Sequence, residues 1–175
     1  MKKLNILLAS FLLVLNCIAQ TEKKPIRGTW VTNVGSDALL NEQNVKETVT
    51  LCREKGLNTI FVVVWNGGVT MYPSKVVKSY IGIKQDTVYK KFDPIACIIK
   101  EGHRQGLQVH AWFEFGFSYS YQDSNSVWFK KYPHWVGRNN KNEILKKNGF
   151  YWWNAMNPEV QLFVKKLVKE VVKKY

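Results

Sequence analysis

The sequence predicts an α/β fold in which parallel strands are joined by helices, and three observations support this class. Apolar stretches rich in β-branched residues alternate along the chain with segments whose apolar residues recur at helical spacing. The turn after each predicted helix is short, whereas the segment after each predicted strand is long. Strand and helix therefore repeat as βαβ units, which place their strands in a parallel sheet.

The composition fits one folded domain. The 175 residues are 46% hydrophobic and 14% aromatic. This excludes a disordered chain, because such a chain lacks the apolar area needed to offset the entropy lost on ordering.

The first strand and the first helix are predicted over residues 27–33 and 41–55. Asn41 is a suitable N-cap, and Gly56 stands at the C′ position where helices commonly end. The helix has three apolar residues at helical spacing, Val45, Val49 and Cys52.

The second strand, residues 57–65, is apolar throughout, which is typical of a strand covered on both faces. A long loop over residues 66–92 leads to the second helix. This helix begins with Asp93 as cap and Pro94 at the first position, and it ends at Gly106. Its apolar stripe consists of Ile95, Ile98 and Ile99.

The third strand is predicted over residues 107–115 and a second long loop over residues 116–156. The last helix begins at Asn157. One face of it is apolar and consists of Val160, Phe163, Val164, Leu167, Val168 and Val171.

Long loops after strands and tight turns after helices are typical of a (β/α)8 TIM-like barrel, which carries its functional residues on the loops at the strands' C-terminal ends. Such a barrel needs eight units in about 250 residues, whereas three strands and three helices are found here. We therefore expect a partial barrel, with residues 27–175 as the N-terminal portion of a longer, truncated domain. A small three-stranded α/β domain that ends in a helix is the alternative.

Residues 1–19 have the layout of a secretory signal peptide, with a basic start, an apolar run over residues 4–18 and a small residue, Ala19, at the expected cleavage site. The run is too short to span a bilayer comfortably. Residues 20–26 are then a polar linker, and no second hydrophobic span follows. We expect an exported protein of the periplasm or cell envelope, without a transmembrane span.

Lipid attachment at Cys17 is the alternative to simple cleavage after Ala19. The residues before Cys17 form a poor lipobox, because Asn16 stands where a small residue is expected. The other two cysteines, Cys52 and Cys97, lie in helical patterns and are expected to be buried thiols.

The chain is strongly basic, with 26 Lys and Arg against 13 Asp and Glu. The lysines are spread over outward-facing helix positions, which indicates a solvated surface. A nucleic-acid-binding protein would show a concentrated patch and a reading motif, so no nucleic-acid partner is expected. Attraction to anionic envelope polymers is compatible with this charge.

Aromatic, amide and carboxylate side chains gather at the predicted C-terminal ends of the strands. They are Asn33, Asp37, Trp65, Asn66, Trp112 and Glu114. Indole rings stack on the apolar face of a pyranose, and amides and carboxylates bind its hydroxyls, so this mixture is typical of a sugar site. Glycoside hydrolysis needs two carboxyl groups across the scissile bond, and Glu114 is the candidate for one of them.

The carboxylates and the indoles also have a structural interpretation. Glu114 could be a hydrogen-bond acceptor at a strand end, and Asp37 could brace the loop before the first helix. Trp30, Trp65 and Trp112 could be core aromatics. The three histidines have no metal-ligand spacing, so neither a metal site nor a cofactor is predicted.

Four segments resemble glycosyl-hydrolase-like family 10, a domain of exported bacterial proteins. They are R-G-T-W-V-T-N-V-G-S-D (27–37), N-T-I-F-V-V-V-W-N-G-G-V-T-M-Y-P-S (58–74), the stretch from F-D-P to H-A-W-F-E-F-G (92–116) and W-W-N-A-M-N-P-E-V-Q (152–161). The resemblance implies a TIM-like barrel that acts on a cell-envelope glycan, including peptidoglycan strands stripped of their peptides.

By position, the resemblance implies that Glu114 is catalytic and that a set of polar and aromatic residues binds the glycan. That set is Trp30, Asn33, Asp37, Trp65, Asn66, Tyr72, Trp112 and Asn154. It also implies that the partner acids lie in a fourth strand beyond Tyr175, so that this chain alone is an inactive fragment of a hydrolase. A non-catalytic carbohydrate-binding protein is the alternative.

Overall fold

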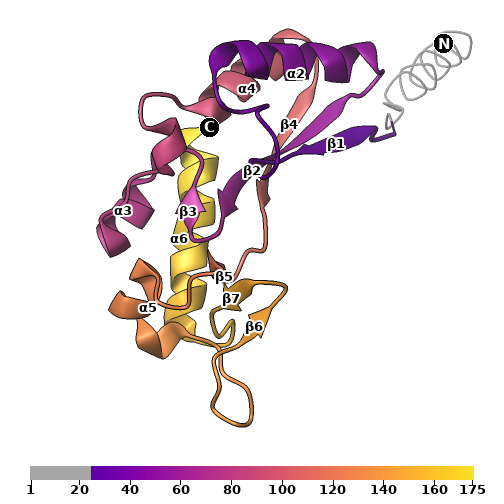
Figure 1. Ribbon diagram of the computed structural model, residues 1–175. Helices are drawn as coiled ribbons and strands as arrows, with labels where there is room; N and C mark the ends of the chain where they lie inside the picture. The colour runs from indigo at the N-terminus through magenta and orange to yellow at the C-terminus, as the bar shows by residue number, and fades with distance from the viewer. Residues whose placement is uncertain (1–24) are drawn as a thin grey trace, which may run out of the picture.

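A computed structural model of the protein describes residues 25–175 (Figure 1). The predicted signal peptide, the alternative lipid anchor at Cys17 and most of the predicted linker lie outside the described residues. The elements in chain order are β1 (Gly28–Val31), α2 (Glu42–Glu54), β2 (Thr59–Asn66), β3 (Val69–Thr70), α3 (Lys75–Ile81), η1 (Thr87–Tyr89), α4 (Pro94–Arg104), β4 (Gln108–Phe113), β5 (Ser118–Tyr121), α5 (Val127–Lys131), η2 (Pro133–Trp135), β6 (Lys146–Lys147), β7 (Phe150–Trp152) and α6 (Pro158–Lys174).

Strands β1, β2 and β4 form the parallel part of an open sheet, with β2 in the centre. The short β3 pairs antiparallel with the end of β2. Within residues 25–175, β1 and β4 each pair on one side only. The three predicted strands are thus confirmed as parallel neighbours in chain order, in a mixed α/β fold of open sheets.

Helices α2 and α4 lie side by side along one face of this sheet (Figure 1). The apolar side chains between helices and sheet are Val45, Val49, Ile60, Val62, Ile95 and Ile98, all of them buried. The predicted N-caps are confirmed, because the side chain of Asn41 accepts a hydrogen bond from the Asn44 N–H at 2.9 Å and that of Asp93 accepts one from the Ala96 N–H at 3.0 Å.

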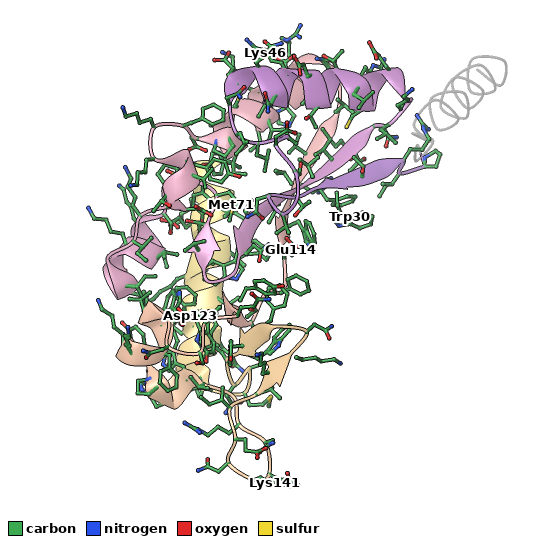
Figure 2. All side chains as sticks on the ribbon, viewed as in Figure 1. Trp30, Lys46, Met71, Glu114, Asp123 and Lys141 are labelled. Atoms are coloured by element: carbon green, nitrogen blue, oxygen red, sulfur yellow. The ribbon has the colours of Figure 1, made fainter. Side chains whose placement is uncertain are left out.

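The opposite face of the sheet carries a row of aromatic rings that is open to solvent. Trp30 stacks on Phe61 with ring centroids 5.2 Å apart, and Phe61 lies 5.5 Å from the ring of His110. Trp30 remains 62% exposed, and Figure 2 shows it pointing away from α2.

The two segments predicted as long loops are more ordered than expected. Residues 66–92 contain β3, α3 and η1, and residues 116–156 contain a second sheet with two short helices. These elements escape a search for periodicity, because each is at most seven residues long. In the second sheet, β7 lies between β5 and β6 and is antiparallel to both.

Helix α6 packs against aromatic side chains supplied by these two segments. The Phe163 ring lies 4.9 Å from that of Trp128, 5.4 Å from that of Trp153 and 5.9 Å from that of Trp65. The predicted apolar face is confirmed for its four buried members, Val160, Phe163, Leu167 and Val171. Aromatic side chains of the two segments predicted as loops therefore cover much of this apolar face.

Glu170 joins α6 to the start of α3. Its Oε1 accepts hydrogen bonds from the backbone N–H groups of Lys75 and Val76, at 2.6 and 3.0 Å. Its Oε2 accepts from the hydroxyls of Ser74 and Tyr72, at 2.5 and 3.1 Å. A carboxylate at a helix N-terminus satisfies unpaired N–H groups and interacts favourably with the helix dipole.

We expect Glu170→Ala to lower the free energy of unfolding by about 2–4 kcal/mol, because it removes these hydrogen bonds and leaves the buried Tyr72 hydroxyl without an acceptor. Urea unfolding of the two chains measures the difference. Lys169→Ala, at an exposed position of the same helix, is the matched control, with a change within about 0.5 kcal/mol. Equal effects of the two substitutions would contradict this role for Glu170.

Candidate active site

The C-terminal ends of the three parallel strands bring together one carboxylate, two amides and a hydroxyl. Glu114 directly follows β4, Asn66 ends β2, and Thr32 and Asn33 follow β1. The Asn66 Nδ2 donates to Glu114 Oε2 at 2.8 Å and lies 3.2 Å from the Asn33 Oδ1. The Thr32 hydroxyl lies 3.4 Å from the same Glu114 oxygen. Three of the residues predicted for the site thus form one hydrogen-bonded cluster.

A β-bulge in β2 decides which side chains reach this cluster. The register with β4 shifts between Val63 and Trp65, so that Trp65 pairs with Phe113 instead of following the alternation set by Phe61 and Val63. One extra residue reverses the direction of every side chain after it. Asn66 therefore points toward Glu114, and Trp65 turns to the other face of the sheet.

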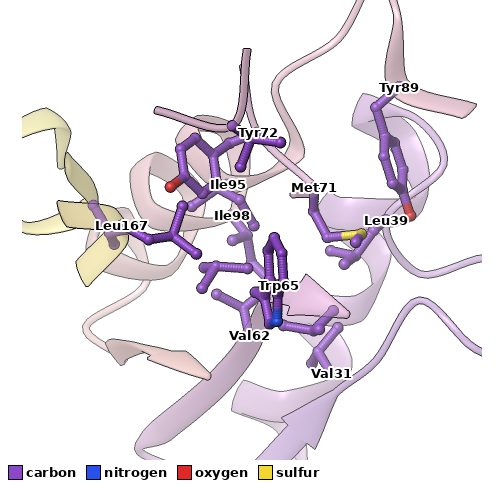
Figure 3. Close-up of a cluster of buried hydrophobic side chains, with 14 of the residues drawn as sticks. Val31, Leu39, Val62, Trp65, Met71, Tyr72, Tyr89, Ile95, Ile98 and Leu167 are labelled. Atoms are coloured by element: carbon purple, nitrogen blue, oxygen red, sulfur yellow. The ribbon is translucent and has the colours of Figure 1, made fainter. Parts of the chain in front are cut away.

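Trp65 is part of the core and is not brought to the cluster. Its exposure is 0%, and its ring lies against those of Trp128, Trp153 and Phe163. Figure 3 shows the ring in the middle of the buried cluster. Only its backbone contacts the site, because its carbonyl accepts the Glu114 N–H at 3.0 Å. The structural interpretation, a core aromatic, describes this placement.

Trp30 and Trp112 lie on the same face of the sheet as Glu114. Trp112 is two residues from Glu114, and residues two apart on a strand share a face; its ring is half-buried. Figure 2 shows Trp30 and Glu114 on the side of the sheet away from α2. Both indoles therefore share a face of the sheet with Glu114, and Trp30 belongs to the open aromatic row.

The structure places the other three predicted residues elsewhere. Tyr72 is buried against α6, with its hydroxyl on Glu170. Asp37 is exposed, and its carbonyl accepts the side-chain amide of Asn44 at 2.8 Å, as expected for a residue that braces the loop before α2. Asn154 lines a separate pocket, and its Oδ1 accepts the Met156 N–H.

The cluster forms one side of a pocket of about 500 Å³, which we call the Glu114 pocket. Its lining residues are Asn33, Val34, Asn66, Gly67, Val69, Asp86, Glu114, Phe115, Tyr121, Asn148 and Phe150. Six of these come from the two segments predicted as loops and were not predicted as site residues: Gly67, Val69, Asp86, Tyr121, Asn148 and Phe150. Phe115, the last residue of the predicted third strand, and Val34 were not predicted as site residues either.

One signal in the sequence could have indicated part of this lining. Asn148-Gly149 lies between two short strands, and both residues have positive φ, 52° and 81°. Asn-Gly is the preferred pair for the two-residue turn of a β-hairpin. Recognition of this turn would have paired β6 with β7 and brought Phe150 out of the predicted loop.

Burial raises the pKa of the Glu114 carboxyl above its ordinary value of 4.5, and the hydrogen bonds from Thr32 and Asn66 oppose this in part. Within residues 25–175, Glu114 forms no ion pair that would favour its charged form. A carboxyl group with a raised pKa keeps its proton to higher pH and is therefore suited to donate it.

This pKa shift makes the stability of the fold depend on pH. A raised pKa in the folded state favours folding below 4.5, and this contribution is lost as the pH rises through the folded-state pKa. We therefore expect the free energy of unfolding of the wild type, relative to that of Glu114→Gln, to fall between acid and neutral pH. Urea unfolding of both chains across this range measures it, and a difference that does not vary with pH would contradict it.

Within the described part of the chain, no group of three or more His, Cys, Asp or Glu side chains is placed to hold a metal ion. Cys52 and Cys97 are free thiols, the first buried and the second half-buried. No helix among residues 25–175 is long and apolar enough to cross a membrane.

Solved structures with a similar fold include partial matches to TIM-barrel glycosidases. An α-galactosidase from Thermus thermophilus in complex with stachyose matches with a TM-score of 0.53 and 16% identity, over 85% of this chain and 32% of that one. An α-amylase from Lactobacillus plantarum matches with a TM-score of 0.54 and 14% identity, over 82% and 35% of the two chains. A hypothetical protein from Ruminiclostridium thermocellum gives 0.59 at 18% identity, over 83% and 70%.

The chain belongs to the glycosyl hydrolase-like 10 family, whose model matches residues 25–175. It is 25% identical over 179 residues to the glycosyl hydrolase DigH of Escherichia coli K12 and 26% identical over 175 residues to the glycosyl hydrolase YngK of Bacillus subtilis. The matches cover 89% and 90% of this chain but only 40% and 32% of those proteins. The chain therefore spans less than half the length of these relatives.

Proposed function

We propose that residues 27–175 are the N-terminal portion of a glycoside hydrolase and that Glu114 is one of its two catalytic carboxyl groups. The observation that carries the proposal is the position of Glu114 at the C-terminal end of a parallel strand, on a pocket that also holds Asn66 and Asn33. Barrel enzymes place their catalytic residues at this end of their strands. Membership of a glycosyl hydrolase-like family supports the reaction class.

We infer that the complete domain is a (β/α)8 barrel, of which this chain supplies the first three units. The support is the order of β1, β2 and β4, which is also their order along the chain, and the unpaired outer sides of β1 and β4. The open row of Trp30, Phe61 and His110 would then face the barrel interior. The limited share of the relatives that the chain covers agrees with this.

The substrate that we propose is a glycan of the bacterial cell envelope, with peptide-free peptidoglycan strands as the first candidate. Residues 1–19 as a signal peptide, or Cys17 as a lipid anchor, would bring the protein to the periplasm or the envelope. Cleavage after Ala19 would remove Lys2 and Lys3 and leave 24 basic against 13 acidic residues, and this net charge of +11 favours contact with anionic envelope polymers.

In this mechanism, the protonated Glu114 carboxyl donates its proton to the leaving glycosidic oxygen while a second carboxylate acts as base or nucleophile on the opposite side of the sugar. Asn66 holds the Glu114 Oε2 in place. In this proposal the second carboxylate belongs to the barrel units that residues 27–175 do not supply, since the chain matches less than half of its relatives' length. No metal or cofactor takes part in these steps.

The test is hydrolysis by the complete gene product. Peptide-free glycan strands from peptidoglycan are incubated with the protein, and new reducing ends are counted with time. We expect reducing ends to accumulate with the complete protein. If the protein binds the strands without hydrolysing them, the proposed hydrolase activity is overturned and a carbohydrate-binding protein is favoured. If it shows no binding and no hydrolysis, both functions are overturned.

A further inference from the structure

Three aromatic side chains form an apolar part of the Glu114 pocket lining, in contrast to its polar cluster. These residues, Phe115, Tyr121 and Phe150, are called the aromatic wall. The Phe150 ring lies 4.1 Å from that of Phe115 and 4.8 Å from that of Tyr121. Phe115 is 43% exposed and Tyr121 is 52% exposed. Contiguous exposed apolar side chains are a feature of many ligand-binding grooves.

The backbone conformation that presents this wall is one that most residues avoid. Phe115 has a φ of +50°, Gln122 after Tyr121 has a φ of +56°, and Asn148 before Phe150 has a φ of +52°. Left-handed backbone is unfavourable for residues with a Cβ and often occurs at functional sites. Phe115 is itself at such a position and Tyr121 directly precedes one, whereas the positive φ of Asn148 is the one that the Asn-Gly hairpin turn requires.

The hairpin turn fits closely against one of these rings. A Cβ added at Gly149 would lie 2.7 Å from the Tyr121 Cε2. Only glycine combines the φ of +81° with this close approach of the ring. The turn between β6 and β7 thus fixes the Tyr121 ring beside Phe150 instead of leaving it free over the surface.

The rest of the pocket lining supplies hydrogen-bonding groups. Glu114, Asn66 and Asn33 form one polar group, and Asp86 and Asn148 lie on the same lining. A pyranose ring has the same division, since its C–H face packs on aromatic rings and its hydroxyls bind amides and carboxylates. Most of these polar groups bond to one another or to nearby backbone, and they keep further donor and acceptor capacity that a purely apolar partner would leave unused.

We infer that the aromatic wall is a sugar subsite directly beside Glu114, on which one pyranose unit of the glycan stacks next to the bond that is cut. This inference rests on the proposed function and deepens it. In this inference the glycan stacks on the aromatic wall and not on Trp65, which is buried. All three side chains of the wall come from residues 115–150, and Phe150 contacts both of the others.

The experiment measures binding in the complete protein with Glu114→Gln as the common background, so that the ligand is not consumed. The probe is the N-acetylglucosamine tetramer, titrated by calorimetry. Phe150→Ala and Phe150→Leu should each weaken binding about tenfold, because both remove the aromatic face. Phe150→Tyr should restore most of the affinity, since it keeps the ring.

Phe150→Leu is the decisive variant. It keeps apolar bulk, so a wall that serves as packing surface for another part of the protein should tolerate leucine in both affinity and thermal stability. Leu162→Ala, at an exposed position of α6 far along the chain, is the control and should leave binding unchanged. Tyr121→Ala repeats the test at a residue of β5, and its thermal midpoint is measured alongside because the Tyr121 ring also contacts the hairpin.

The outcomes separate the subsite from the function. Affinity unchanged by both Phe150→Ala and Phe150→Leu, in a protein whose wild type hydrolyses glycan strands, would overturn the subsite and leave the proposed function standing. Affinity retained by Phe150→Leu but lost in Phe150→Ala would also overturn it, in favour of a packing surface. No hydrolysis by the wild type, with no binding of the tetramer, would overturn the proposed function itself.

Discussion

Glu114→Gln should reduce glycan hydrolysis by the complete protein by roughly 10²- to 10⁴-fold, the usual contribution of a general acid or base. The amide cannot donate a proton to the leaving oxygen. Its own oxygen can still accept the hydrogen bond from Asn66 Nδ2 that now reaches Glu114 Oε2 at 2.8 Å, so the cluster should keep its geometry. The rate of release of reducing ends at saturating substrate measures the effect.

Glu101→Gln provides the matched control. Glu101 is also a shielded carboxylate, but it lies on α4 and accepts hydrogen bonds from Arg104 and Gln105. Those hydrogen bonds lower its pKa to about 2, so it holds no proton to donate near neutral pH. Its substitution should lower stability and leave the rate unchanged. If Glu114→Gln kept more than about a tenth of the rate with an unchanged fold, Glu114 would not be the acid.

The elements that could be predicted from the sequence are those whose signals are local. Asn41 and Asp93 cap their helices, and Pro94 follows its cap, within a few residues of one another. The apolar β-branched run of β2 likewise indicates a buried central strand by itself. For this reason three strands and three helices were predicted with ends within about two residues of the observed ones.

The part of the candidate site that could be predicted from the sequence is the set of residues at the ends of the parallel strands. Glu114, Asn66 and Asn33 meet because parallel strands end at one edge of a sheet. The bulge between Val63 and Trp65 depends on pairing between distant strands, so no local pattern reports it. Because of it, an indole expected at the site lies in the core.

The roles of the aromatic residues in the two long segments could not be predicted from the sequence either. Trp128, Trp135 and Trp153 lie in a stretch without long periodic elements and nevertheless make much of the core around α6. Composition alone does not distinguish an aromatic that packs under a helix from one that lines a pocket, such as Phe150. Only the contacts of the fold separate the two groups.

Trp65→Ala should lower the free energy of unfolding by about 3–5 kcal/mol, since it empties a large volume in a core that the neighbouring rings cannot refill. Trp65→Phe should have a smaller effect, because Phe keeps the ring contacts and removes an indole N–H that is buried without a hydrogen-bond partner in the described structure. Urea unfolding of the three chains gives the order of their stabilities.

Trp30→Ala is the matched control for the stability effect of Trp65→Ala. Trp30 was predicted for the same sugar site but is 62% exposed and stacks mainly on Phe61, so its loss should change the unfolding free energy by less than about 1 kcal/mol. A core role for Trp65 requires a large stability effect that Trp30 does not share. If Trp65→Ala instead unfolded like the wild type and lost glycan binding, its indole would have to face the sugar, and the bulge that turns it into the core could not be present in solution.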